Sequence, residues 1–398
     1  MLSDTELHEL ARQLALGAVY DAGEAGTPRV ALTAASPSLL AARAHYAACL
    51  LRTSGPATAR EPGVHTSAGA TGTVAVLFPG RAESPAQPGL LAASLEALGT
   101  LELLGVKPVT GVGYGLGEIT GLVWAGCFSA AEAARLVAQC RQVLRACACG
   151  PAAMARIAGN AELTRALCGP DRLNIAAYEG PSAHVLAGST AGIRELARRA
   201  SSLGVPVEVL AGTRAMHSPA MARCVAPLRS VFAGTHAAAP QRRLISTITG
   251  HLVTAGDDIT ELLARQVSLP VLFAQAMAQA AQGADLIVIA GPEAGLAAAA
   301  AACGGAPAVV IPAPAPPASG SVTSAEAVAA LFAAGAITDL TPLLTASSST
   351  DTLARRTVPR MRMAELPARQ APREPDLAGQ PDGAAERKTT ARSAKLTC

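Results

Sequence analysis

The sequence is poor in aromatic residues, poor in charge and balanced in sign. Phe, Tyr and Trp make up 3% of the 398 residues, and Asp, Glu, Lys and Arg make up 15%. A formal net charge of +3 indicates no concentrated basic face of the kind that nucleic-acid-binding proteins carry. The alanines at 297–302 are too few for a bilayer crossing, which needs about eighteen apolar residues. We therefore expect neither a nucleic-acid partner nor a membrane span.

Metal-binding and secretory patterns are also missing. The nine cysteines are odd in number and contain no C-x-x-C pair, and Cys147-Ala-Cys149 has one spacer too few for a zinc knuckle. Residues 1–9 are polar and acidic, unlike a signal peptide. We expect buried thiols in a reducing compartment, a cytoplasmic location, no metal site and no cofactor.

What is present is an alanine-rich chain with one distinctive glycine-rich stretch. Residues 109–112 are a short β-prone run, after which every second residue from 113 to 117 is glycine. From residue 118 to 126, apolar residues recur at helical spacing. A strand, a tight turn and a helix are the parts of a nucleophile elbow, in which G-x-S-x-G presents a serine. Gly115 stands where that serine would be.

The same glycines suggest a dinucleotide-binding loop as an alternative. The G-x-G-x-x-G pattern fails because its last position, counted from Gly113, is Glu118. We keep dinucleotide binding as a separate hypothesis, and binding of such a cofactor to the purified protein would support it.

The rest of the chain alternates strands and helices. Strands are expected at 29–32, 74–78, 243–249, 286–290 and 309–312, and helices at 4–20, 36–51, 88–104, 130–144 and 325–334. Residues 152–212 follow the order strand, helix, strand, strand, helix, strand, which is typical of a ferredoxin-like arrangement. Residues 53–72 and 312–321 are linkers by composition, and the polar, Pro-rich residues from 346 onward predict disorder.

Three motifs resemble those of one enzyme family. Gly113-Tyr-Gly-Leu-Gly-Glu118 resembles the G-H-S-x-G-E motif of malonyl-CoA:acyl-carrier-protein transacylases and polyketide synthase acyltransferase domains. Met216-His-Ser-Pro219 is similar to their H-S-P motif, and Phe78-Pro-Gly80 to the start of their F-P-G-Q-G strand. The resemblance runs in register from Thr73 to Pro312. The sequence of residues 118–126 most resembles the corresponding sequences of acyltransferases from iterative synthases.

The resemblance implies an α/β fold with a known layout. An α/β-hydrolase-like acyltransferase core would carry an inserted ferredoxin-like subdomain, preceded by a small α/β linker region. The implied parts are a linker-like region at 1–72, an acyltransferase-like domain at 73–312 with its small subdomain at 152–212, a C-terminal linker at 313–345, and a tail at 346–398. A helical N-terminal appendage without kinship to such linkers is the alternative for the first part.

The resemblance also assigns catalytic positions. His217 takes the general-base position, and Gly115 takes the position of the nucleophilic serine, which is lost. Tyr114 replaces the family histidine beside it and is expected to fill space above the elbow. Ser218 is a conceivable substitute nucleophile, but a serine before a proline at a helix start is more typical of an N-cap.

Substrate positions follow from the same alignment. The backbone amides of Arg81 and Leu116 would form the oxyanion hole, although the family has glutamine at the first of these positions. Cys140 falls where malonyl-accepting members carry an arginine that pairs with the substrate carboxylate. The stretch after Arg81 is shorter than in the family, which predicts a missing wall of the active-site cleft.

Together these losses predict a degenerate acyltransferase. Such a domain would be a structural or docking part of a polyketide or fatty-acid-like synthase, with acyl carrier protein and ketosynthase or other synthase domains as partners. The alternative is a working enzyme that binds acyl-CoA. In it, His217 would act with water, a carrier thiol or another nucleophile such as Cys140 on acyl thioesters.

Overall fold

The part of the chain that the computed structural model describes lies within Met1–Leu366. The described residues are 19–20, 28–34, 36–53, 61–68, 72–80, 89–147, 150–169, 173–210, 214–291, 295–311 and 322–337. Most of the helix predicted at 4–20, Arg81, the linker predicted at 312–321 and the tail from 346 onward lie outside them.

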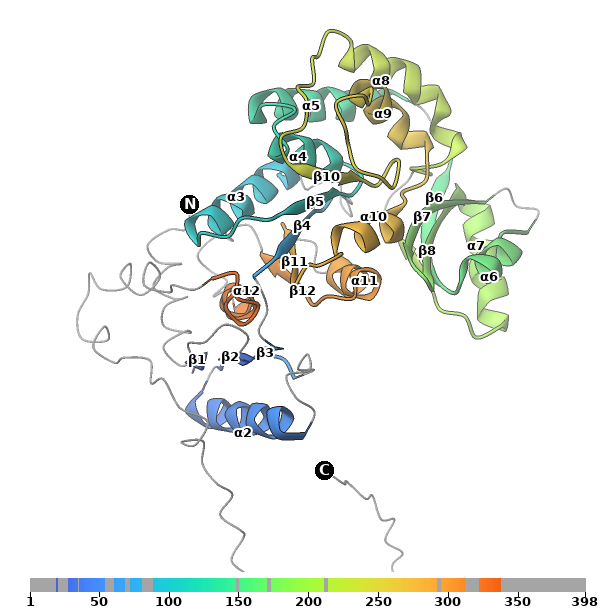
Figure 1. Ribbon diagram of the computed structural model, residues 1–398. Coiled ribbons are helices and arrows are strands. Elements are labelled where there is room, and N and C mark those ends of the chain that lie inside the picture. The colour runs from blue at the N-terminus through green and yellow to red at the C-terminus, as the bar shows by residue number, and fades with distance from the viewer. Residues whose placement is uncertain are drawn as a thin grey trace, which may run out of the picture. The chain divides into compact units, whose positions relative to one another are not determined.

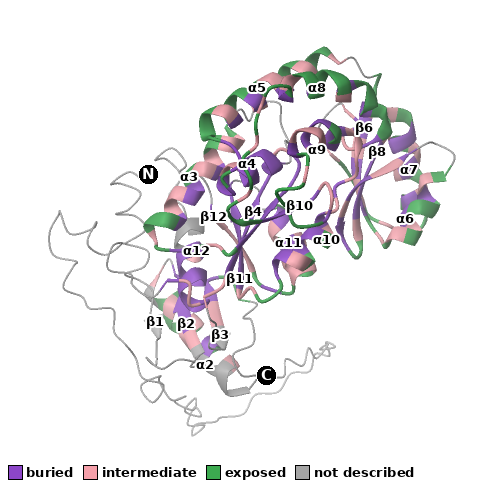
Figure 2. Cartoon of the chain, turned by 45° about the horizontal axis from the view of Figure 1, so that its top comes forward, coloured by how far each residue is buried: buried purple, intermediate pink, exposed green. Residues whose placement is uncertain are grey.

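A parallel sheet with the strand order β10-β5-β4-β11-β12 forms the centre (Figure 1). Its strands are β4 (Val74–Phe78), β5 (Thr110–Gly113), β10 (Arg243–Ser246), β11 (Leu286–Ala290) and β12 (Ala308–Ile311). Every residue of β4, β5 and β11 is buried (Figure 2). The sequences of β4 and β11 are short apolar runs without alternation because helices and a second sheet cover both faces of the sheet.

Alternate residues of β4 point into two different cores. Val76 and Phe78 face one core cluster, and Leu77 faces the other. The first cluster includes side chains of α3 (Leu90–Leu103), α4 (Gly117–Trp124), α5 (Ala130–Ala146), α8 (Val225–Phe232) and α9 (Ile259–Arg265). The second includes side chains of α10 (Phe273–Ala280) and α11 (Gly295–Gly304). The sheet is therefore covered on both faces, as an α/β fold requires.

A second, antiparallel sheet lies beside α10 and α11 (Figure 1). It has the order β7-β8-β6-β9, and we call it the small sheet. Its elements are β6 (Ala152–Ala158), α6 (Ala161–Cys168), β7 (Asn174–Gly180), β8 (Ala183–Ser189), α7 (Thr190–Ser202) and β9 (Val207–Leu210). Ile157, Leu186 and Leu196 fill the core under α6 and α7. The opposite face packs on the central part through residues such as Ala177 and Val185.

The N-terminal residues form a third sheet of three strands. β1 (Val19–Tyr20), β2 (Pro28–Leu32) and β3 (Val64–Ala68) pair antiparallel, with α2 (Pro37–Thr53) on one face and α12 (Val322–Ala333) on the other (Figure 1). The prediction that 53–72 is only a linker is wrong, because β3 lies inside it. The helix predicted to reach Tyr20 is also wrong at that end, where β1 lies.

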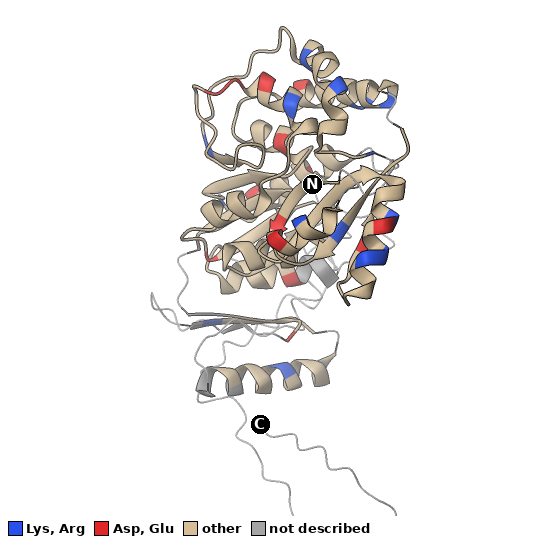
Figure 3. Ribbon diagram, turned by 90° about the vertical axis from the view of Figure 1, so that its right-hand side faces the viewer, with Lys and Arg blue, Asp and Glu red and all other residues tan. Residues whose placement is uncertain are grey.

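The helices carry charged side chains of both signs. Figure 3 shows acidic and basic residues interleaved on the helices. Glu195 and Arg198 of α7 form one ion pair, and Arg229 of α8 and Glu261 of α9 form another. Within the described residues, none of the helices combines the length and the hydrophobicity that a bilayer crossing requires.

Candidate functional site

The predicted elbow is present between β5 and α4. The Tyr114 amide donates to the Phe78 carbonyl at 3.0 Å, and the Gly117 amide donates to the Tyr114 carbonyl at 2.8 Å, which closes the turn. The loop after β4 passes so close that a side chain at Gly80 would collide with the backbone of Tyr114 and Gly117. A Cβ at Gly117 would collide with the Phe78 carbonyl oxygen, so Gly80 and Gly117 allow the backbones at two neighbouring strand ends to touch.

Gly115 occupies the tip of this elbow in a left-handed conformation, with φ of +57°. A Cβ atom at this position would lie 3.7 Å from Nε2 of His217 and 3.3 Å from the carbonyl oxygen of Gly80. A serine hydroxyl attached to that carbon would therefore be within reach of the imidazole. The predicted pairing of positions 115 and 217 is realised in space, although only one of the two carries a functional group.

His217 is held in a defined orientation. Its backbone has φ of +56°, the only positive φ outside glycine in the described chain, which is the kind of strain found at functional sites. Nδ1 lies 2.9 Å from the Gln266 carbonyl oxygen. Because a carbonyl only accepts, Nδ1 carries the proton and Nε2 is left as an acceptor facing Gly115.

The surroundings keep this imidazole neutral. Burial lowers the pKa of His217 below its ordinary value of 6.5, against an opposing contribution from hydrogen bonds to the backbone of Gln266 and Leu269. A neutral imidazole with a free Nε2 is the form that accepts a proton in general-base catalysis. Nε2 of His217 can therefore accept a proton, while position 115 carries no side chain that could donate one.

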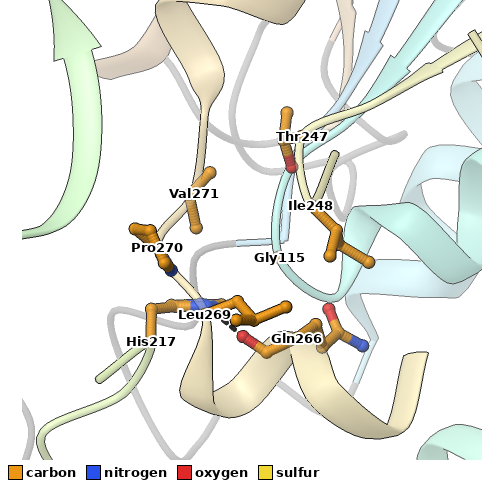
Figure 4. Close-up of a pocket in the computed structure, with 8 residues that line it drawn as sticks. All are labelled: Gly115, His217, Thr247, Ile248, Gln266, Leu269, Pro270 and Val271. Carbon is orange, nitrogen blue, oxygen red and sulfur yellow. Dashed lines mark hydrogen bonds between the residues drawn. The ribbon is translucent and has the colours of Figure 1, made fainter. Parts of the chain in front are cut away.

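A narrow pocket lies above Gly115, and we call it the elbow pocket (Figure 4). It is lined by Gly115, His217, Thr247, Ile248, Gln266, Leu269, Pro270 and Val271. The volume open to a water molecule is about 0 Å³. None of these residues is Lys or Arg, so the described part of the chain offers no cation in this pocket for a substrate carboxylate.

One wall of the elbow pocket is fixed by a buried carboxyl group. Glu118 is 2% exposed, and its Oε1 accepts hydrogen bonds from the Thr247 amide at 2.6 Å and from the Thr247 hydroxyl at 2.7 Å. Burial raises the pKa of Glu118 to about 7, against an opposing effect of the Thr247 hydrogen bonds. Since the Thr247 amide bonds to Glu118, β10 ends at Ser246, three residues before the predicted end at 249.

A larger cavity of about 510 Å³, the outer pocket, opens on the other side of His217. Its lining comes from α6, from β7 and from the segment around η3 (Gln266–Ser268). The lining residues are Arg165, Cys168, Leu173, Asn174, Ile175, Tyr178, His217, Pro219, Ser268, Leu269 and Pro270. His217, Leu269 and Pro270 are shared with the elbow pocket and separate the two spaces.

The other predicted site residues lie in different places. Tyr114 is buried and does not line the elbow pocket; its hydroxyl bonds to Glu179 of β7 at 2.8 Å. Cys140 is 5% exposed inside the core under α5, and burial raises the pKa of its thiol to about 12, so it is not a thiolate. Within the described residues the Leu116 amide has no hydrogen-bond partner. Arg81 is outside the described residues.

The Ser218 hydroxyl also has a partner. It donates to the Ala215 carbonyl at 2.7 Å and is 1% exposed. Ser218 precedes the 3₁₀ helix η2 (Pro219–Cys224) as predicted for an N-cap, but its side chain makes no cap hydrogen bond. A buried, bonded hydroxyl of this kind is a structural group.

Sequence reasoning missed the residues that act through the backbone or through burial. Gln266 orients His217 with its carbonyl, which every residue has, so its identity gives no signal. Glu118 was identified only as the last residue of a motif, without a role. The pocket walls at Ile248 and Leu269–Val271 come from irregular segments that contain no motif.

The chain is similar in sequence to acyltransferase domains of known proteins. The family model described as "Acyl transferase domain" matches residues 82–312. Polyketide synthase GfsB of Streptomyces halstedii is 34% identical over 225 residues, which are 54% of this chain and 4% of that protein. Mycoketide-CoA synthase of Mycobacterium tuberculosis is 33% identical over 217 residues, 54% of this chain and 5% of that protein. The chain spans only these small fractions of such relatives.

Solved structures agree with the sequence matches. The acyltransferase domain of the iterative polyketide synthase in enediyne biosynthesis has a TM-score of 0.69 and 31% identity, over 79% of this chain and 85% of that chain. The malonyl-CoA:acyl carrier protein transacylase of Xanthomonas oryzae has a TM-score of 0.58 and 22% identity, over 66% of this chain and 99% of that chain. The second likeness is one of fold alone.

Proposed function

The chain belongs to the family of acyl transferase domains, and we propose that it is a degenerate member that serves as a structural or protein-docking part of a polyketide or fatty-acid-like synthase. The observation that carries this proposal is Gly115. Acyl transfer by an elbow nucleophile needs an oxygen or sulfur atom to hold the acyl group, and the residue at the tip has no side chain. Loss of such a serine costs on the order of 10⁶ in kcat.

Two further features support the loss of transfer. The elbow pocket has no room for a water molecule, so a reactive acyl carbon cannot sit beside Nε2 of His217 without movement of the walls. The residue at the predicted carboxylate-anchor position, Cys140, is buried in the core. Neither the nucleophile nor the anchor for a malonyl group is therefore available in this geometry.

The proposal extends to the finer layout. The order of strands and helices in the small sheet supports a ferredoxin-like subdomain at 152–212, and the parallel sheet with its elbow supports a hydrolase-like core within 73–312. Residues 1–72 and 313–345 would then be the linkers that join the domain to its neighbours. The partners we propose are an acyl carrier protein and a ketosynthase or other synthase domain.

A second candidate function is direct catalysis by His217. It is favoured by one observation, which is that the imidazole is neutral, oriented and also lines the outer pocket of about 510 Å³. If residues 269–270 moved and joined the two pockets, the carbonyl of a thioester bound in the outer pocket would reach Nε2. Water or a carrier thiol would then lose its proton to Nε2 and attack that carbonyl, and the leaving thiolate would take up the proton. The amides of Leu116 and Arg81 would stabilise the oxyanion.

Intact-mass analysis separates the two candidates. The protein is incubated with acetyl-, malonyl- and methylmalonyl-CoA, with and without holo acyl carrier protein, beside His217→Ala and Gly115→Ser. We expect no adduct on the natural chain and carrier loading equal to that without protein. A covalent adduct, or loading or hydrolysis that disappears in His217→Ala, would contradict the proposal and support direct catalysis.

A further inference from the structure

Tyr114 connects the elbow to the small sheet. Its side chain is not among those that line the elbow pocket, and the residue is 4% exposed. The hydroxyl donates to Oε1 of Glu179 at 2.8 Å, and the ring packs edge-on against Phe273 of α10 with 5.4 Å between centroids. The residue directly before the nucleophile position is thus bonded to β7.

Glu179 is a buried carboxylate with donors from two layers of the fold. It is 2% exposed, and its Oε2 accepts from Nε of Arg156 on β6 at 2.8 Å. Arg156 in turn bonds to Glu208 on β9 at 2.6 Å. Because a buried carboxylate is costly unless its lone pairs are satisfied, the Tyr114 hydroxyl stabilises β7 in its position against the elbow.

The position of β7 also determines that of residues 269–271, which line the elbow pocket and which we call its roof segment. The Val271 amide donates to the Ala176 carbonyl at 2.8 Å, and the Tyr178 amide donates to the Val271 carbonyl at 2.9 Å. One residue later, the Leu272 amide donates to the Thr247 carbonyl at 2.7 Å. Residues 269–271 line the elbow pocket, so a movement of β7 away from the elbow would carry this roof with it.

We propose that Tyr114 and Glu179 form a lock, a hydrogen bond that holds β7 and the roof segment 269–271 down and keeps the elbow pocket closed. The lock rests on the proposed function, since a domain that transfers no acyl group has no need to open this pocket. Both are positioning residues, because neither lines the elbow pocket.

Cys303 of α11 provides a natural reporter of the lock. Its thiol donates to the Glu179 carbonyl at 3.3 Å, and burial, together with the nearby Glu179 charge, raises the pKa of the thiol to about 11. Release of β7 would remove both effects and expose the thiol, which would then react faster with an alkylating agent. Cys224, with 0% exposure in the other core cluster, reports on general unfolding.

The test compares Tyr114→Phe with the natural chain by iodoacetamide labelling at pH 8, resolved by site with peptide mass spectrometry. Arg229→Gln, which breaks the exposed pair with Glu261, is the matched control. We expect Cys303 labelling to rise by about tenfold in Tyr114→Phe, since a hydrogen bond to a charged group contributes on the order of a decade in an equilibrium constant. Labelling of Cys224, and of Cys303 in Arg229→Gln, should not change.

A second readout concerns the pocket itself. In a Gly115→Ser background, where an acyl group can be captured, Tyr114→Phe should raise the rate of acyl-enzyme formation, again by about tenfold. Unchanged Cys303 labelling, or a parallel rise at Cys224, would overturn the lock. An acyl adduct on the natural chain would instead overturn the proposed function and leave the labelling result standing, so the two failures are distinguishable.

Discussion

At the scale of single residues, Gly115 holds a backbone conformation that other residues adopt only at a cost. Its φ is +57°, and the nearest atom to a new Cβ would be the Gly80 carbonyl oxygen at 3.3 Å. We expect Gly115→Ala to lower the free energy of unfolding by about 1–2 kcal/mol, the cost of a left-handed residue with a side chain. Urea denaturation measures this change.

Gly99 in α3 is the control for that measurement. It lies inside a helix, and no heavy atom is within 4 Å of a Cβ added there. Gly99→Ala should therefore raise the free energy of unfolding by about 0.5–1 kcal/mol. Equal effects of the two substitutions would show that the left-handed conformation at position 115 carries no cost.

At the residue scale, a motif specifies which positions belong together in space, and it does not specify the direction of each side chain. Gly115 and His217 were predicted as partners, and the structure brings them together. The direction of Tyr114 was not predictable, because its partner Glu179 is separated by 65 residues and belongs to no motif. Long-range polar contacts of this kind depend on the packing of two sheets, which a single sequence does not encode in any local pattern.

At the scale of elements, α5 begins with a complete capping box. The Ser129 hydroxyl accepts from the Glu132 amide, and the Glu132 carboxylate accepts from the Ser129 amide at 3.0 Å. Ser129→Ala should cost about 1 kcal/mol of unfolding free energy, because the first-turn amide loses its acceptor. Thermal denaturation of this variant beside Ser230→Ala, an exposed serine within α8, tests the claim; equal losses would contradict it.

The predicted strands were correct where the sequence is an uninterrupted apolar run, and a strand was missed where the composition resembled that of a loop. β4 and β11 were predicted at their observed bounds because buried parallel strands are uninterrupted apolar runs. β3 was missed because its sequence, VHTSA, lies in a stretch of Gly, Pro, Ser and Thr. Pairing with β2 stabilises β3, which is a tertiary effect that overrides local preference.

At the scale of the whole molecule, α12 joins the N-terminal sheet to the central part. Leu331 belongs to the core cluster of the central sheet, and Phe332 packs on Ala31 of β2. Leu331→Ala should lower the free energy of unfolding by about 2–5 kcal/mol, as for other fully buried leucines. It should also speed amide hydrogen exchange in β2, and exchange unchanged there would contradict the coupling.

Leu103 is the control for that substitution. It is 60% exposed at the end of α3, so Leu103→Ala should change the free energy of unfolding by no more than about 0.5 kcal/mol. Comparison of the two variants then separates the loss of buried packing at Leu331 of α12 from the general effect of shortening a leucine side chain.

The pH dependence of stability has two opposing parts. Burial lowers the pKa of His65 to about 4, and it also lowers the pKa of His184 and of His217, from an ordinary value of 6.5. The unfolded chain then binds more protons, so stability is lost as the pH falls below about 6.5. Glu118, raised from 4.5 to about 7, acts oppositely, because stability is lost as the pH rises through that range.

Glu118→Gln removes the contribution of the Glu118 carboxyl group to the pH dependence of stability and leaves the contribution of the three histidines. We expect the melting temperature of this variant to fall more steeply between pH 7 and pH 5 than that of the natural chain, measured by differential scanning calorimetry. Parallel curves for the two proteins would show that Glu118 has an ordinary pKa in the folded state.

The geometry at the elbow has a consequence for the gene. A glycine codon that ends in a pyrimidine becomes a serine codon by one base change, and a tyrosine codon becomes a histidine codon by another. With such a glycine codon at position 115, Gly113-Tyr-Gly115 is two base changes from Gly-His-Ser, while His217 is still oriented by Gln266. A selection for carrier loading from random point mutants would find its first revertants at positions 115 and 114.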